Sequence, residues 1–240
     1  MFNTTVAWIT LRATLSRRRA LLFALPALIL ILLTVALRAS RAPMRPWPSH
    51  VLGTFGFSVL IPLTALIIGT SVLGAEVDEG SIVHLLATPV PRSVVIWNKY
   101  LVAVLLTATF VAVPELLAAL IATGGLTKLA VGLFVGALAC SVIYNAVFVM
   151  VSTATTRAIA VGLLYVLVWE VLLSNFVSGV KLLSVSHYGL GIANGLASDP
   201  VLEAGLGVLT SVVMGAIVTV VALALAMNLL SSFTLKGEPA

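Results

Sequence analysis

The densest group of acidic side chains in this sequence lies in residues 76–92, between two long apolar stretches. Three carboxylates, Glu76, Asp78 and Glu79, stand close together at its start. Acidic side chains at the C-terminal end of a helix oppose its dipole, so these do not stabilise the helix that precedes them. A surface segment of this kind can bind a complementary surface on another molecule. We interpret it as a contact segment, and an ordinary solvated loop stays open as the alternative.

The same segment predicts a short helix that lies along a surface. Gly80 can end the preceding helix, and Ser81 can cap a new one. Pro89 then ends the new helix after about two turns, because a proline pushes the residue before it out of the helical region. The remaining residues of this contact surface are His84, Leu85, Leu86, Thr88 and Arg92.

Two further carboxylates lie deep inside apolar stretches, Glu115 after Pro114 and Glu170 after Trp169. At 1.5 Å per helical residue, each is roughly 10 Å below the outer face of a bilayer. An ionised group there costs several kcal/mol unless it is protonated, paired or in contact with water. Two interpretations stay open: a polar substrate path or gate, or a helix–helix clamp or neutral carboxyl.

Asn145 and Asn175 are the other polar side chains considered for such a path. Amide side chains commonly form hydrogen bonds between membrane helices. We therefore expect Asn145 to bond a neighbouring helix rather than a ligand.

Catalytic and metal-binding sites are not expected. Cys140 is the single cysteine, and His50, His84 and His187 are far apart along the chain. No Gly-x-x-x-x-Gly-Lys-Ser/Thr phosphate loop occurs, so this chain is not expected to bind ATP by that route. The net charge of +5 is spread thinly and fits loop charges near lipid headgroups better than nucleic-acid binding.

Apolar helices must hold these residues in place. Of the 240 residues 61% are hydrophobic and 9% are charged, and the mean hydropathy is +1.21. Soluble proteins carry about 25% charged residues, so lipid is the expected solvent. The apolar runs are continuous, which favours helices over the alternating strands of a barrel. Runs long enough to cross a bilayer predict an all-α protein of six spans at 20–37, 52–75, 94–123, 129–152, 158–176 and 207–232.

These spans form a single expected domain, residues 1–240. Residues 4–19 predict an amphipathic helix at the membrane surface with Trp8 as its anchor, and a frayed tail is the alternative. The excess of Lys and Arg places both termini and residues 76–92 in the cytoplasm. Residues 177–206 are half apolar yet too interrupted to span, which favours re-entrant or short outer helices. Gly132 and Gly136 give the fourth span a small-residue face for tight packing within the subunit or across a dimer.

Residues 76–92, together with Lys99, resemble the signature of the ABC-2 type transporter permeases. That signature has an acidic residue, Glu-x-Gly-Thr/Ser, a Leu-Leu pair, a small residue, Thr/Ser-Pro, and then an Arg and a Lys that lead into the third span. The resemblance covers about 25 residues closely, and the six-span layout extends it in outline. Ser81 stands where Thr is common.

The resemblance implies a permease of a bacterial cell membrane that works with a second copy of itself, as a homodimer, or with a related permease, and with a separate nucleotide-binding ATPase subunit. Residues 76–92 would be the coupling helix that contacts this subunit. ATP and Mg²⁺ would bind the partner, so this chain would be no enzyme and would hold no cofactor. It implies export of a hydrophobic or amphipathic substrate such as a drug or lipid. A haem-exporter B-type permease of cytochrome c maturation and a non-transporting scaffold or assembly protein stay open as alternatives.

Overall fold

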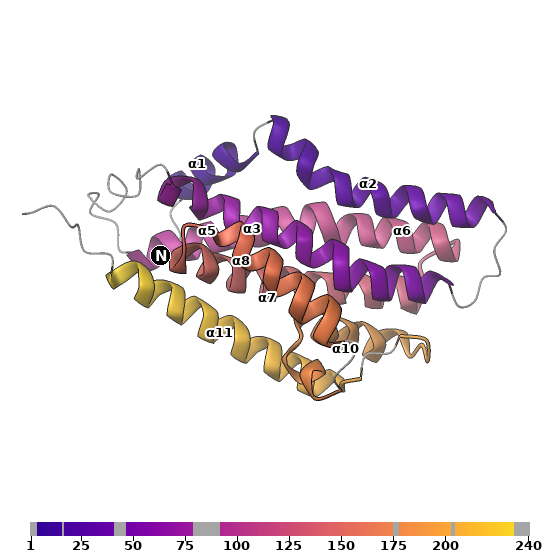
Figure 1. The fold of residues 1–240 in the computed structure, drawn as a ribbon. Coiled ribbons are helices and arrows are strands. Elements are labelled where there is room, and N and C mark those ends of the chain that lie inside the picture. The colour runs from indigo at the N-terminus through magenta and orange to yellow at the C-terminus, as the bar shows by residue number, and fades with distance from the viewer. Residues whose placement is uncertain are drawn as a thin grey trace, which may run out of the picture.

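Long apolar helices run side by side along most of the molecule (Figure 1). The computed structural model describes residues 4–15, 17–40, 47–78, 92–174, 178–202 and 205–232, and no strand forms within these ranges. The elements are α1 (Thr4–Thr14), α2 (Arg17–Ala39), η1 (Ser49–Leu60), α3 (Ile61–Asp78), α5 (Arg92–Thr107), η2 (Ala108–Ala112), α6 (Val113–Thr123), α7 (Lys128–Ala154), α8 (Ala158–Leu164), η3 (Tyr165–Leu173), η4 (Ser178–Leu183), α10 (Val185–Ala197) and α11 (Val208–Ser232).

Five of the described helices are long and apolar enough to cross a membrane. They are Arg19–Ala39, Ser49–Leu73, Ser93–Thr123, Lys128–Ala154 and Val208–Leu230. These correspond to five of the six spans expected from hydropathy. The remaining one, expected over 158–176, corresponds to a shorter apolar helix, Ala158–Leu173. The six-span layout therefore stays a prediction at this one helix.

Helix ends and irregular turns follow from particular residues. Gly124 ends α6 with a φ of 77°, a left-handed conformation that glycine adopts without strain. The Thr127 side chain then caps α7 by accepting a hydrogen bond from the Ala130 backbone N–H at 3.2 Å. The π-helical turns η1 and η2 end just before Pro62 and Pro114. A proline has no N–H to donate and crowds the preceding turn, and a wider turn accommodates this.

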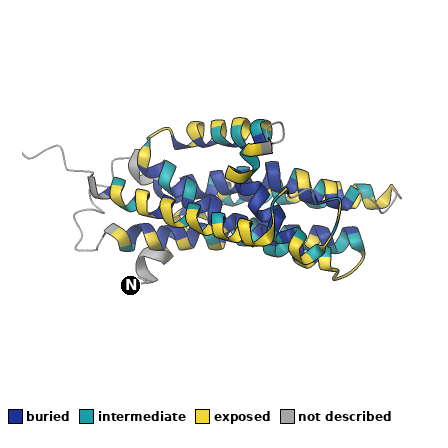
Figure 2. Cartoon of the chain, turned by 90° about the horizontal axis from the view of Figure 1, so that it is seen from below, coloured by how far each residue is buried: buried dark blue, intermediate teal, exposed yellow. Residues whose placement is uncertain are grey.

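Helix α7 lies at the centre and contacts α3, α5, α6, α10 and α11. Its buried side chains, Tyr144 and Phe148 among them, join the larger of two apolar clusters. Buried residues line the inside of the bundle and exposed ones its outside (Figure 2). Many exposed side chains are large and apolar, such as Leu21 on α2 and Leu209 on α11. Contact between such a surface and lipid carries no hydrophobic penalty, whereas contact with water does.

The two ends of the bundle differ (Figure 1). One end, called here the α1 end, holds α1, the end of α3 and the starts of α2, α5 and α8. The expected amphipathic helix over 4–19 is shorter here, because α1 stops at Thr14 and α2 begins at Arg17. The opposite end, called the α10 end, holds η4 and α10 in the segment 177–206.

Helix α10 lies directly against α7. A Cβ atom added at Gly136 would stand 2.5 Å from the Gly189 carbonyl oxygen and 3.0 Å from the Ala193 Cβ. One added at Gly132 would stand 2.5 Å from the Ala193 carbonyl oxygen. The small-residue face of the fourth span is therefore used within the subunit, because only glycine leaves room for the α10 backbone.

Candidate functional site

The expected contact segment begins and ends at the α1 end. Glu76 and Asp78 belong to the last turn of α3, and Arg92 is the first residue of α5. Since both helix ends lie at the α1 end, the connection between them starts and finishes there (Figure 1). The other residues expected in the contact lie outside the described residues; they are Glu79, Gly80, Ser81, His84, Leu85, Leu86, Thr88 and Pro89.

Lys99 joins α5 to α3 just inside these ends. Its side chain is only 1% exposed, and its Nζ donates a 2.7 Å hydrogen bond to the Val72 carbonyl oxygen. In the sequence this lysine was noted only as part of the resemblance that leads into the third span, and its burial was not predicted. Its position is the signal that could have revealed it, since it lies about two turns into a helix that starts at Arg92. This hydrogen bond therefore joins α3 to α5, the two helices that border the contact segment.

Glu170 lies in η3 and is completely buried. Its Oε1 accepts hydrogen bonds from the Tyr165 hydroxyl and the Val185 backbone N–H, both at 2.9 Å. Its Oε2 accepts from the Ser184 and Ser186 hydroxyls at 2.6 and 2.8 Å and from the Ser186 backbone N–H at 3.3 Å. All of the lone pairs of this carboxylate are thereby used by the protein.

The Glu170 carboxylate fixes the start of α10. Ser184 is the N-cap of that helix, and the first N–H groups of a helix have no partner within it. A carboxylate there satisfies these groups and favours the positive end of the helix dipole. These donors were not predicted from the sequence, because most of them come from residues 184–186, which follow Glu170 by 14 to 16 positions.

Glu115 has a different environment. It lies in the first turn of α6, is 1% exposed, and its Oε1 has no hydrogen-bond partner among the described residues. A Cβ added at Gly56 would stand 3.1 Å from its Oε2, so η1 approaches the carboxyl closely. A crevice of about 10 Å³ beside it is lined by residues of α2, η1, α3, η2 and α6, Pro26 among them. That volume is about the room a single water needs.

Asn145 connects α7 to α5. Its Nδ2 donates to the Thr107 hydroxyl at 2.9 Å and to the Ser141 carbonyl at 2.7 Å. Its Oδ1 is buried without a partner within the described ranges. Asn175 lies outside the described residues. The hydrogen bonds of Glu170 and Asn145 share no residue.

Metal binding finds no support in the part of the chain that the structure describes. No group of three or more His, Cys, Asp or Glu side chains is placed there to hold an ion. Cys140 is a free, buried thiol whose Sγ contacts the Val185 carbonyl oxygen at 3.6 Å. Among the described residues, the arrangement consists of anchored helices, a buried hydrogen-bonded cluster around Glu170 and Ser184, and the separate buried polar groups of Glu115 and Asn145.

Comparison with known proteins gives one match and one negative result. Residues 15–170 match the family model described as ABC-2 family transporter protein. The matched region runs from the start of α2 into η3 and covers well over half of the chain. No curated protein matches the chain.

Proposed function

The chain belongs to the ABC-2 family of transporters, and on that premise we propose that it forms the membrane pathway of an exporter, with residues 76–92 as the segment that receives force from its ATPase. Membership makes the chain a multi-pass permease that pairs with an ATP-binding subunit. Export, the two-copy assembly and the role of residues 76–92 are our proposals. ATP and Mg²⁺ belong in this scheme to the partner subunit.

One observation carries the coupling proposal: α3 and α5, the helices on either side of residues 76–92, are joined to each other inside the bundle. Lys99 of α5 donates to the Val72 carbonyl of α3 at 2.7 Å. Displacement of a stiff surface segment would therefore move both helices together. Packed helices that shift as one body are a common route by which movement at one site reaches another.

The distribution of basic residues supports one orientation of the bundle in the membrane. We propose that the α1 end faces the cytoplasm, because more basic residues lie there than at the α10 end and basic residues are retained on the cytoplasmic side. Those towards the α1 end are Arg12, Arg17, Arg18, Arg19, Arg92, Lys99 and Arg157, against Arg38, Lys128 and Lys181 towards the α10 end. An ATPase in the cytoplasm can then reach residues 76–92. The excess of basic residues in the sequence gave the same orientation.

Glu115 is the better of the two buried carboxylates for a polar path. The Glu170 carboxylate is fully used in holding α10, whereas one oxygen of Glu115 accepts no hydrogen bond from the described part of the chain and lies beside a crevice. We propose that Glu115, with Asn145 and Asn175, faces the route of a hydrophobic or amphipathic substrate such as a drug or lipid. Glu170 then serves as the clamp of the outer segment.

Co-purification with the ATPase subunit tests the coupling proposal. The double variant Leu85→Asp with Glu79→Lys should lose the partner and the transport-coupled part of ATP hydrolysis. Leu126→Asp is the matched control, because Leu126 is exposed in the turn at the α10 end. Unchanged docking and coupled hydrolysis in the double variant would show that residues 76–92 have another role.

A further inference from the structure

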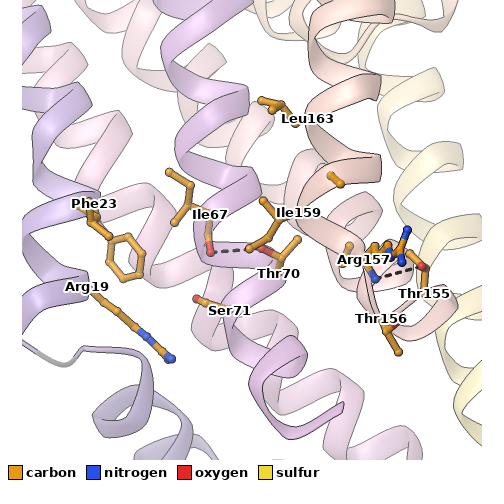
Figure 3. Close-up of a pocket in the computed structure, with 13 residues that line it drawn as sticks. Arg19, Phe23, Ile67, Thr70, Ser71, Thr155, Thr156, Arg157, Ile159 and Leu163 are labelled. Carbon is orange, nitrogen blue, oxygen red and sulfur yellow. Dashed lines mark hydrogen bonds between the residues drawn. The ribbon is translucent and has the colours of Figure 1, made fainter. Parts of the chain in front are cut away.

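A pocket of about 660 Å³ opens at the α1 end between α2, α3 and the start of α8 (Figure 3). Arg19 contributes from α2 and Arg157 from the turn before α8, on opposite sides of the pocket, with Ile67, Thr70 and Ser71 of α3 between them. The buried carboxylates and the described residues of the proposed coupling segment are not among its lining. Nothing in the proposed function uses this pocket.

The polar part of the pocket is cationic. Both arginines are exposed, and no carboxylate is among the described residues that line the pocket. Thr70 and Ser71 each donate their hydroxyl hydrogen to their own helix, to Leu66 and Ile68, so they are not free donors. The hydroxyls of Thr155, which accepts from the Arg157 backbone N–H, and of Thr156, together with the two guanidinium groups, are the side-chain donors of the lining that remain for an anion. Arginine is well suited to a phosphate, because its planar N–H groups match two oxygens at once.

The rest of the lining is apolar and lies on the outer surface of the bundle. Leu22, Ile159 and Leu163 are exposed, and Phe23 forms the inner wall. A volume of about 660 Å³ is in the range of sites for whole organic ligands and exceeds what an inorganic phosphate fills. Arginines above apolar walls match an anionic headgroup above an acyl chain.

The level of the pocket fits the same ligand. Arg19 lies at the first residue of an apolar helix long enough to span, and Arg157 lies in the turn between α7 and α8. Basic residues at the ends of membrane helices lie in the headgroup region. Basic pockets between helices at this level bind anionic lipid headgroups.

We propose that this pocket binds the phosphate of an anionic lipid of the adjoining leaflet, with Arg19 and Arg157 on the headgroup and Phe23, Ile159 and Leu163 along the chain. The proposal holds whether the lipid is a resident of the site or a transported molecule. It does not depend on export or on an ATPase.

Native mass spectrometry of the detergent-purified full chain tests the proposal by titration with phosphatidylglycerol and, separately, with phosphatidylcholine of equal chain length. The wild-type protein should retain phosphatidylglycerol in preference. Arg19→Gln and Arg157→Gln should each weaken that binding about five-fold, and the double variant about 25-fold. The control Arg12→Gln with Lys128→Gln removes the same charge from outside the pocket and should bind as the wild type does.

A second variant separates the pocket from simple surface charge. Ala160→Trp keeps both arginines and fills the apolar part of the cavity, because Ala160 is an exposed lining residue. It should lose phosphatidylglycerol while keeping the wild-type circular dichroism spectrum. Equal binding of both lipids, equal loss in the control, or unchanged binding in Ala160→Trp would each overturn the proposal.

Free phosphate is the other source of the same chemistry. Inorganic phosphate at millimolar concentration should not displace phosphatidylglycerol, because it cannot use the apolar walls. Displacement by inorganic phosphate at concentrations close to those of the lipid would show a simple anion site and would also overturn the proposal.

Discussion

The Lys99 ammonium donates to the Val72 carbonyl oxygen at 2.7 Å inside the bundle, and so joins the last turns of α3 to the first turns of α5. A hydrogen bond from a charged group contributes about 1.5–3 kcal/mol, enough to keep two helices in register. Within the proposed function, α3 and α5, which border the coupling segment at residues 76–92, must then move together.

Lys99→Met tests that relationship. The variant keeps most of the side-chain volume and removes the hydrogen bond, so we expect insertion and ATPase docking to be retained. Transport per ATP hydrolysed should fall about tenfold, since this corresponds to the loss of a single charged hydrogen bond. The measurement is substrate flux and ATP hydrolysis in the same proteoliposomes. Leu101→Met, an exposed change on the same helix, is the control, and wild-type coupling in Lys99→Met would contradict the expectation.

Glu170→Ala should detach the start of α10. The change leaves two backbone N–H groups and several hydroxyls buried without their acceptor, at a cost of at least about 3 kcal/mol in the free energy of unfolding. Glu170→Gln keeps one acceptor oxygen and should lose less. Titration with SDS in mixed micelles measures the difference. An alanine variant as stable as the wild type would mean that α10 is held by its apolar contacts alone.

Glu115→Gln should have the opposite outcome. Ionising a carboxyl group in a buried membrane site costs several kcal/mol, so the fold gains nothing from a charge on Glu115, and an amide of the same shape should keep or raise stability. The same titration gives the answer, with Glu170→Gln as the internal comparison. A marked loss of stability in Glu115→Gln would reveal a partner that needs the negative charge.

Gly136→Ala should destabilise the bundle although alanine favours helices. Alanine gains about 1 kcal/mol in a helix over glycine. Its Cβ would lie 2.5 Å from the Gly189 carbonyl oxygen, which is backbone and cannot turn aside. Overpacking of this kind costs about 1–3 kcal/mol, so a net loss is expected. Gly125→Ala, with nothing within 4 Å of the new Cβ, should be neutral or better.

His187 predicts a pH dependence. Burial lowers its pKa from the usual 6.5, the charge of Lys181 lowers it further, and Glu170 opposes the change. The unfolded chain therefore binds this proton at a higher pH than the folded chain does. Stability should fall as the pH drops through 6.5, by the linkage between protonation and folding. Melting curves between pH 5 and pH 8 should show this slope for the wild type and for His50→Asn, and a shallower slope for His187→Asn.

Hydropathy predicted five helices closely because each spanning helix must be apolar along its own length. It could not place Lys99, because the burial of a lysine depends on a carbonyl 27 residues earlier in the chain. The partners of Glu170 were missed for the same reason: Ser184 and Val185 meet it only after the chain has turned back. The small-residue face at Gly136 was predicted, whereas its neighbour was left open between this subunit and another.

The short length of α10 and its close contact with α7 imply an order in which these two helices enter the membrane. With 13 residues it is shorter than the roughly 20 that a bilayer-crossing helix needs, so it has no independent means of insertion. Gly132 and Gly136 leave the room that α10 occupies, and both are synthesised before α10. During synthesis, α7 is therefore already in the membrane when α10 packs against it. A chain that stops within α7 would lack part of the surface against which α10 packs.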